Sequence, residues 1–186
     1  MKKSSVFFMK LLRRIINPLS KWYRTTAFLC GLKSYENNID VKGSVYLWND
    51  NVSIGSGTGI YPGVTLWGKG EIDIGKNTEI GINTVIYSKR RVSIGNNVLI
   101  AANCYIIDSN HSIYKNDIIR EQEDVFKGPV IIEDDAWLGA GVKVLSGVHI
   151  GKGAVIGAQS LVNKDIPDYA IAVGVPAKVI SFRKEK

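Results

Sequence analysis

The chain of 186 residues contains two histidines, His111 and His149. Histidine takes up and releases a proton near neutral pH, so it is the usual general base for activating a hydroxyl group. His111 follows the apolar pair Ile106-Ile107 and lies near the start of a stretch, 109–127, in which a six-residue repeat is interrupted. His149 stands at an outward position of an ordinary repeat. We therefore expect chemistry at His111 rather than at His149.

The repeat around these histidines predicts a solenoid. An aliphatic residue recurs every six positions and a small residue commonly follows it, as in Ile54-Gly55 and Ile100-Ala101. A six-residue unit cannot bury its own apolar side chain, so successive units must stack to form a core. Three units make one coil, and the coils before the interruption are longer than those after it because they have added residues at one corner. The inward aliphatic positions are Val41, Leu47, Ile54, Ile60, Leu66, Ile74, Ile80, Ile86, Ile94, Ile100, Ile106, Ile132, Leu138, Val144, Ile150, Ile156 and Val162.

The positive charge of the chain is concentrated at its N-terminus. Residues 1–33 hold eight of the 24 Lys and Arg residues and no acidic residue, so the remaining 16 bases nearly balance all 17 acids. Residues 4–17 and 20–30 are predicted to form helices, the second ending at Gly31. These helices either cap the open end of the solenoid or lie in a membrane interface as a peripheral contact.

Composition excludes several other classes. The body of the chain has no basic groove with regularly spaced aromatic residues, which argues against nucleic acid as a partner. Cys30 and Cys104 are isolated and form no CxxC motif, which favours a reducing, cytoplasmic location. No uninterrupted apolar run of spanning length is found, so we expect neither a signal peptide nor a membrane-spanning helix.

Three local motifs carry a resemblance to a known family. They are the segment 106–111 (IIDSNH), the segment 136–141 (AWLGAG), and the segment 157–167 that leads to 173–180. Together with the repeat they resemble the hexapeptide-repeat acyltransferases, in the branch of sugar and xenobiotic O-acetyltransferases that modify maltose, nodulation factors and polysaccharides. The resemblance implies an all-β, left-handed parallel β-helix. It would consist of a basic helical segment (1–33), a β-helix (34–180) with an extended loop (109–127), and a C-terminal tail (181–186).

The resemblance implies an acetyl-CoA-dependent O-acetyltransferase that acts on a saccharide hydroxyl by direct transfer, in surface polysaccharide or glycan biosynthesis. It also implies a homotrimer with active sites at subunit interfaces, and no metal. The alternatives are an N-acetyltransferase acting on an amino sugar or antibiotic, and a non-catalytic hexapeptide scaffold. A γ-class carbonic anhydrase is excluded because its metal requires three histidines.

Under the resemblance, His111 is the general base. Its second ring nitrogen would be held by Asp108, by Asn110 or by a backbone carbonyl. The backbone N–H groups near Gly139 and Ala140 would contact the thioester oxygen, where charge develops.

The remaining predicted residues bind the two substrates. Trp137 either lines the pantetheine channel or covers the exterior of the coil, and the small residues Gly157 and Ala158 keep a flat face for the pantetheine arm. Either Lys164 and Arg183 contact the CoA phosphates or they are solvated. On the acceptor side, maltose-type enzymes carry Asn-x-Asn and an acidic group, but here only Asn83 is present. The basic residues Lys89 and Arg90 then either bind an acceptor with a phosphate or carboxylate or form a solvated corner.

Overall fold

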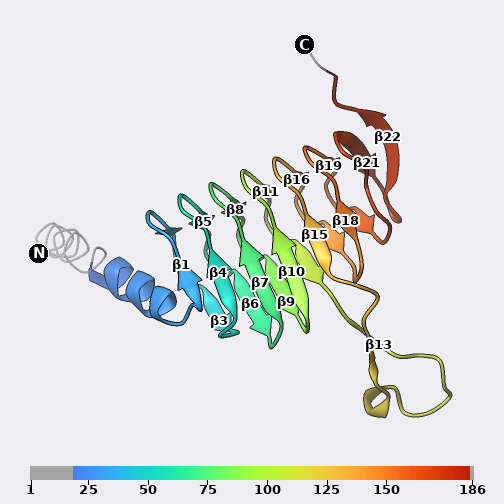
Figure 1. The fold of residues 1–186 in the computed structure, drawn as a ribbon, viewed down its shortest axis with the longest axis horizontal. Helices are drawn as coiled ribbons and strands as arrows, with labels where there is room; N and C mark the ends of the chain where they lie inside the picture. Colours follow the sequence, from blue (N-terminus) through green and yellow to red (C-terminus); the bar gives the residue numbers. More distant parts are fainter. Residues whose placement is uncertain (1–18, 185–186) are drawn as a thin grey trace, which may run out of the picture.

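The computed structural model describes residues 19–184, which form a parallel β-solenoid with one helix at its N-terminal end (Figure 1). Three parallel sheets run along the solenoid. The first sheet contains β1 (Ser34–Tyr35), β4 (Val52–Ile54), β7 (Glu71–Ile74), β10 (Arg91–Ile94), β15 (Val130–Ile132) and β18 (His149–Ile150). The second contains β2 (Asp40–Val41), β5 (Gly59–Ile60), β8 (Glu79–Ile80), β11 (Leu99–Ile100), β16 (Trp137–Leu138), β19 (Val155–Ile156), β21 (Ala170–Val173) and β22 (Lys178–Phe182). The third contains β3 (Tyr46–Trp48), β6 (Thr65–Gly68), β9 (Val85–Ser88), β12 (Tyr105–Ile107), β17 (Lys143–Val144) and β20 (Leu161–Val162).

Each coil takes one strand from each sheet and turns at a corner between them. Coil 1 is β1 to β3, coil 2 is β4 to β6, coil 3 is β7 to β9, coil 4 is β10 to β12, coil 5 is β15 to β17 and coil 6 is β18 to β20. We call the turn from the second to the third sheet the second corner (residues 61–64, 81–84, 101–104, 139–142 and 157–160). The turn from the third to the first sheet is the third corner (residues 49–51, 69–70 and 89–90, and the long insertion 108–129).

The strand register confirms the coil lengths expected from the repeat. Ile54 pairs with Ile74 in the longer early coils, and Ile132 pairs with Ile150 in the shorter late coils. Coil 1 is intermediate in length, since Tyr35 pairs with Ile54. The extra residues of the early coils lie at the third corner, and the loop leaves the solenoid at this corner too.

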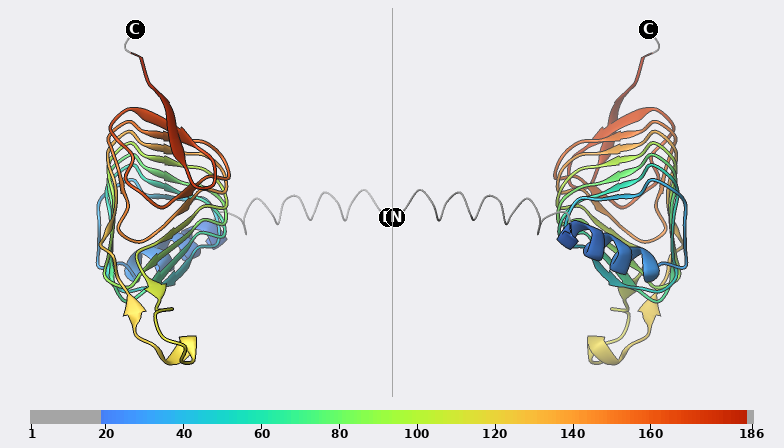
Figure 2. Two further views of the ribbon diagram at one scale, coloured as in Figure 1. Left: turned by 90° about the vertical axis from the view of Figure 1, so that its right-hand side faces the viewer. Right: turned by 90° about the vertical axis from the view of Figure 1, so that its left-hand side faces the viewer.

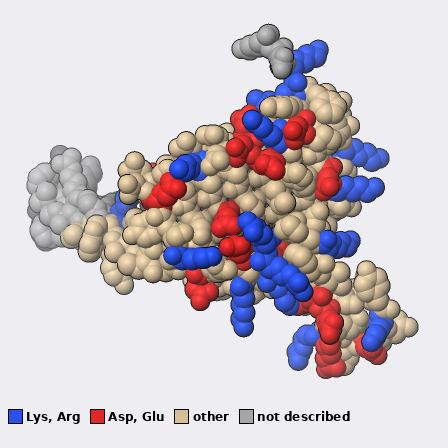
Figure 3. Space-filling model, in the orientation of Figure 1, with Lys and Arg blue, Asp and Glu red and all other residues tan. Residues whose placement is uncertain are grey.

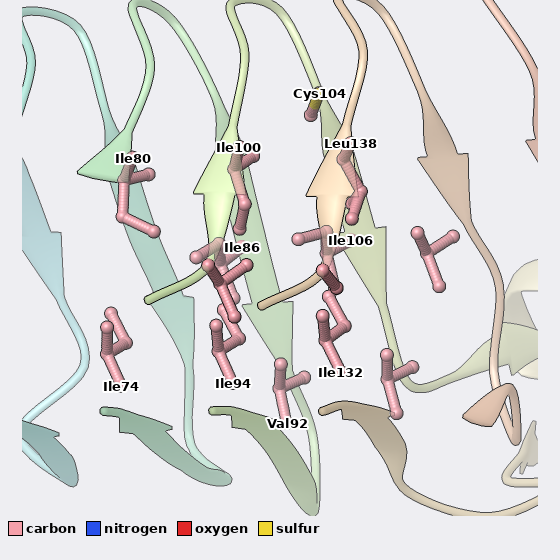
Figure 4. Close-up of a cluster of buried hydrophobic side chains, with 14 of the residues drawn as sticks. Ile74, Ile80, Ile86, Val92, Ile94, Ile100, Cys104, Ile106, Ile132 and Leu138 are labelled. Atoms are coloured by element: carbon pink, nitrogen blue, oxygen red, sulfur yellow. The ribbon is translucent and has the colours of Figure 1, made fainter. Parts of the chain in front are cut away.

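The core is a narrow prism of stacked aliphatic side chains. Figure 4 shows them in rows that follow the sheets: Ile80, Ile100 and Leu138 from the second sheet, and Ile74, Ile94 and Ile132 from the first. All are buried. In most units a smaller inward residue lies two positions before the aliphatic one, and where this residue is Thr78 its hydroxyl donates to the Gly95 carbonyl at 2.8 Å. This bond removes the cost of burying the hydroxyl.

The helix spans residues 19–30, followed by a turn at Gly31, in agreement with the helix predicted over 20–30. Phe28 is buried in the core and Leu32 packs against it, so the end of the helix covers coil 1. The helix predicted over 4–17 lies outside the described residues. Within the part of the chain that is described, no helix combines the length and the apolar character needed to cross a membrane.

The long insertion projects from the third corner of coil 4, at the lower right of Figure 1 and at the bottom of both views in Figure 2. It contains β13 (Asn110–His111), the 3₁₀ helix η1 (Ile119–Glu121) and β14 (Asp124–Val125). At the other end of the chain, β22 turns back antiparallel along β21. The segment expected as a tail from residue 181 therefore begins within this last strand.

Candidate active site

His111 is held at the base of the long loop by a short antiparallel ladder. β13 pairs with β14 so that His111 lies directly opposite Asp124. Side chains of directly opposed residues in an antiparallel pair are neighbours, and the imidazole Nδ1 lies 3.2 Å from the Asp124 Oδ1. A carboxylate at this distance favours a proton on Nδ1, and that tautomer leaves Nε2 as an acceptor. Nε2 has no partner within the described residues, so it can receive a proton from a bound molecule.

The pocket in front of His111 is lined mainly by aromatic side chains. It has a volume of about 300 Å³ and is formed by Trp67, Tyr87, Tyr105, Ile107, Ser109, Asn110, His111 and Asp124. The predicted residue Asn110 thus shares the pocket with His111, although it does not bond to the ring. Burial raises the pKa of the Tyr105 hydroxyl, which therefore stays protonated at neutral pH. The pocket thus combines aromatic walls with the His111 imidazole and the polar side chains beside it.

The basic cluster, for which either acceptor binding or a solvated corner was considered, anchors the loop. The Lys89 ammonium is in contact with the second oxygen of Asp124, and the Arg90 guanidinium lies 4.8 Å from the centre of the Phe126 ring. Charged side chains of both signs intermingle around the base of the loop (Figure 3). Lys89 and Arg90 thus have partners in the loop itself, and the structure gives no support to their role in binding an anionic acceptor.

Asp108 has a different role from the one expected. It is fully buried, and its carboxylate accepts the backbone N–H groups of Lys89, Arg90 and Arg91 at 2.8, 2.8 and 2.7 Å. The Asp108 carbonyl also accepts a hydrogen bond from the Ser146 hydroxyl. Asp124, not Asp108, is the carboxylate beside the His111 ring. Asp108 thus holds the backbone of the third corner of coil 3, which carries the side chains that contact the loop.

We expect Asp108→Ala to destabilise the protein. The substitution leaves three backbone donors without their acceptor, which should cost about 2–4 kcal/mol after partial replacement by water. The melting temperature, followed by circular dichroism, should fall by on the order of 10 °C. Asp117→Ala is the matched control, because Asp117 is exposed in the loop and should shift melting by no more than about 1 °C. An unchanged melting temperature for Asp108→Ala would contradict this structural role.

A second group of predicted residues lies along the second corner. Gly139 and Ala140 turn the chain in coil 5, and Gly157 and Ala158 stack on them in coil 6. The Gly139 N–H is used by the ladder, donating to the Ile156 carbonyl at 2.8 Å, so it is not available to a ligand. The Ala140 N–H has no acceptor within the described chain. Of the two predicted contacts for a thioester oxygen, only Ala140 has a free donor.

The second corner differs from the turn between the first and second sheets in how its N–H groups are used. At that other turn, side chains of the next coil cap the backbone, as when the Asn96 Oδ1 accepts the Lys76 N–H at 2.8 Å. At the second corner, the N–H groups of Ala102, Ala140 and Ala158 have no acceptor among the described residues. Unpaired backbone donors beside small side chains form a strip that can bind carbonyl oxygens. Pantetheine contains amide carbonyl groups, so these free N–H groups could bind it.

Trp137 lies beside this strip on the outer face of the second sheet. It is 51% exposed and borders a hollow of about 280 Å³ together with Tyr61, Glu79, Gly81, Ile82, Leu99, Ile100, Ala101 and Ala102. This placement is compatible with both roles considered for Trp137, since a channel wall and a surface between copies both require an exposed ring.

For three further predicted residues the structure shows no contact with His111 or with the free N–H groups of the second corner. Asn83 lies at the second corner with a φ of 57°, the left-handed conformation that asparagine tolerates in a turn. Arg183 donates to Asp135 at 2.8 Å and to the Gly153 carbonyl at 3.0 Å, so its guanidinium is held by the solenoid. Lys164 is exposed after β20. Neither the Asn83 role in acceptor binding nor the Arg183 contact to CoA gains support.

Within one chain, the two groups are separated by the third sheet. The second corner and the third corner lie at opposite ends of its strands, as Asn103 and Asp108 do in coil 4. An extended strand of this length spans ~16 Å. His111 and Ala140 of the same chain are therefore attached at opposite edges of the third sheet.

Matches to family models and known proteins agree with this fold. Residues 129–164 match the bacterial transferase hexapeptide (six repeats), and residues 71–107 match the hexapeptide repeat of succinyl-transferase. A probable acetyltransferase of Mycobacterium tuberculosis is 43% identical over 81 residues, which are 44% of this chain and 27% of that protein. The galactoside O-acetyltransferase of Lactococcus lactis is 54% identical over 61 residues, which are 33% of this chain and 30% of that protein. The chain thus spans less than a third of these two relatives.

A similar solved structure extends the comparison to the whole solenoid. An N-acyltransferase from Bacillus cereus, crystallised with a dTDP-linked amino sugar and coenzyme A, superposes with a TM-score of 0.78 at 24% identity. The superposition covers 87% of this chain and 89% of the other. The predicted solenoid is confirmed, including its hand. The chain therefore carries hexapeptide repeats and has the left-handed β-helix fold of the hexapeptide-repeat acyltransferases.

Proposed function

We propose that the protein is an acetyl-CoA-dependent O-acetyltransferase that modifies a saccharide hydroxyl by direct transfer, in the biosynthesis of a surface polysaccharide or another glycan. The observation that carries this proposal is the pairing of His111 with Asp124 at the mouth of an aromatic pocket. A base with one ring nitrogen held and the other free is what activation of a hydroxyl requires.

The residues of the site have different roles in acyl transfer. His111 accepts the proton of the acceptor hydroxyl on Nε2, and Asp124 stabilises the imidazolium that results. The same ring can return this proton to the departing sulfur, so no further proton donor is needed. The Ala140 N–H donates to the oxygen on which negative charge develops. Acetyl-CoA supplies the acetyl group as an activated thioester.

We propose that two copies of the chain complete each site, in a homotrimer with three such interfaces. The ~16 Å between the two corners of one chain supports a site in which His111 meets Ala140 of another copy. The tip of the loop favours the same arrangement, because its side chains Ile113, Tyr114 and Ile118 are 75%, 81% and 63% exposed. A projecting apolar tip of this kind is typical of a segment that packs on a neighbouring subunit.

Replacement of the aspartate tests the pair directly. We expect Asp124→Asn to lower kcat by about 10- to 100-fold, as for other residues that orient a histidine, with little change in KM for acetyl-CoA. In a His111→Ala background the same change should have no further effect, because the two side chains act as a unit. Steady-state kinetics of the four proteins measures the coupling. Additive losses would show that Asp124 does not act through His111.

The reaction itself is tested by mass spectrometry of products formed from acetyl-CoA and a panel of saccharides. An acetyl group that mild alkali or hydroxylamine removes is an ester, whereas an amide survives this treatment. Alkali-stable products would favour the N-acetyltransferase acting on an amino sugar or antibiotic. Absence of both turnover and acetyl-CoA binding at millimolar concentration would leave the non-catalytic scaffold.

We propose a cytoplasmic location with peripheral contact to the membrane through the basic N-terminal segment. Residues 1–33 carry eight basic and no acidic side chains, and Trp22 and Tyr23 are exposed on the helix. Since Phe28 belongs to the core, the appropriate test removes residues 1–18 only. The full chain should co-sediment with anionic vesicles several-fold better than the shortened chain. Equal co-sedimentation would contradict the proposal.

A further inference from the structure

A column of aromatic side chains runs along the outer face of the third sheet, from coil 1 toward the His111 pocket. Trp48 pairs with Trp67, and Trp67 pairs with Tyr87, so the three rings project from one register position of successive coils. Neighbouring parallel strands are about 4.8 Å apart, so the column presents one ring for each coil. The Trp67 and Tyr87 ring centres are 4.9 Å apart, with an angle of 67° between the ring planes.

The column extends beyond the pocket already described. Trp67 and Tyr87 line the His111 pocket, whereas Trp48 lies one coil further from it and borders a second hollow of about 530 Å³. The side chains of Asp50 and Lys69 also border this hollow, and both are exposed. Two hollows are therefore aligned along one face, each with an indole ring at its edge and polar groups beside it.

The rings of the column are open to solvent. Trp48 is 66% and Trp67 46% exposed, while Tyr46, whose ring lies 6.4 Å from that of Trp48, is 51% exposed. The apolar face of a sugar ring carries C–H groups that pack against the negatively charged face of an aromatic ring. The hydroxyls at its rim need hydrogen-bond partners such as Asp50 and Lys69. Indole rings beside polar groups therefore suit a carbohydrate.

The position of the column favours a ligand of the site over a second copy of the chain. Its aromatic residues occur in coils 1 to 3, on the N-terminal side of the loop, and Ile107 follows Tyr87 in register in coil 4. At the neighbouring outward position, Tyr105 is followed beyond the loop by Lys143 and then by Leu161. An interface between parallel solenoids would use the full length of a face. This column instead ends where His111 stands.

We propose that the third sheet binds a glycan of several sugar residues lengthwise, with the reacting residue in the His111 pocket and the following residues over Trp67 and Trp48. The inference rests on the proposed function and adds that the acceptor is an oligomer or polymer rather than a free monosaccharide. The side chains of Trp48, Asp50 and Lys69 then determine chain-length specificity.

The test measures binding of sugar oligomers to full-length His111→Ala, in which turnover is blocked. The probes are cello-, malto- and chito-oligosaccharides of one to six residues, and titration calorimetry measures the affinity for each. For at least one series we expect affinity to rise about tenfold for each further ring that stacks, up to about four residues. Adding Trp48→Ala should remove the gain for the longer oligomers and leave binding of the shortest unchanged. Trp22→Ala is the matched control, an equally exposed indole on the helix, and should have no effect.

The outcomes separate this inference from the proposed function. Length-dependent binding by a protein that transfers no acetyl group supports the glycan face and rejects the function. Acetyl transfer to short and long acceptors with equal kcat/KM supports the function and overturns the inference. Failure of every series to bind, or an unchanged length dependence in Trp48→Ala, also overturns it. A lower oligomer mass for Trp48→Ala in sedimentation, with binding unaltered, would assign the face to contacts between copies.

Discussion

Substitution of His111 by alanine is expected to lower kcat by about 10²- to 10⁴-fold, the usual contribution of a positioned general base. The fold should be unaffected, because His111 lies in the exposed loop and its side chain is 67% accessible. Steady-state kinetics with acetyl-CoA and an identified acceptor measures the loss, and thermal melting shows whether the structure is retained.

His149→Ala is the matched control for this prediction. The His149 Nε2 lies 3.0 Å from Glu133 on the outer face of the first sheet, away from either hollow of the third sheet. It therefore lies beside a carboxylate much as His111 does, yet it lines neither of these hollows. We expect His149→Ala to retain full kcat. Comparable losses of kcat in the two variants would show that His111 has no special role in catalysis.

Ala140→Pro should remove the donor to the oxyanion without disturbing the fold. Gly141 has a φ of 72° and the Val142 N–H donates to the Gly139 carbonyl at 3.3 Å, which together define a type II turn with Ala140 at its second position. Proline is favoured at this position. In coil 2 the chain already has Pro62 there, followed by Gly63 with a φ of 78°. The substitution thus replaces one N–H by a ring that the corner accommodates elsewhere.

The expected effect of Ala140→Pro is a loss of about 10²- to 10³-fold in kcat, as for removal of one oxyanion donor in other enzymes. Melting should change little. Ala140→Gly retains the N–H and serves as the control, with kcat within about tenfold of the unaltered protein, since only a methyl group is lost. If Ala140→Pro and Ala140→Gly had equal activity, the backbone donor would have no part in catalysis.

The sequence was sufficient to predict the solenoid, because the positions of Ile54, Ile74 and Ile94 already express the period of the coil. The same register would have revealed the aromatic column, since Trp48, Trp67 and Tyr87 are separated by one coil each. The sequence analysis did not predict the column, because packing of the core does not determine the residue types at outward positions. Only the strand register brings these three aromatic residues into one line.

The partner of His111 could not be predicted in the same way. Asp124 lies on the far side of a loop without any repeat, and only the pairing of β13 with β14 brings the two side chains together. Asp108 is nearer in sequence, but the backbone of the third corner uses its carboxylate. Proximity along the chain was therefore a poor guide where the chain leaves the regular coil.

The central claim is that each active site combines His111 of one chain with Ala140 of another. Co-expression of His111→Ala and Ala140→Pro chains with different affinity tags, followed by purification on both tags, isolates mixed assemblies. In a cyclic trimer, every mixed assembly contains one interface with both residues intact, so activity should recover to about one third of the unaltered protein. Each variant alone should stay near background. If His111 and Ala140 acted within one chain, no site would be restored and the mixed assemblies would be as inactive as their parents.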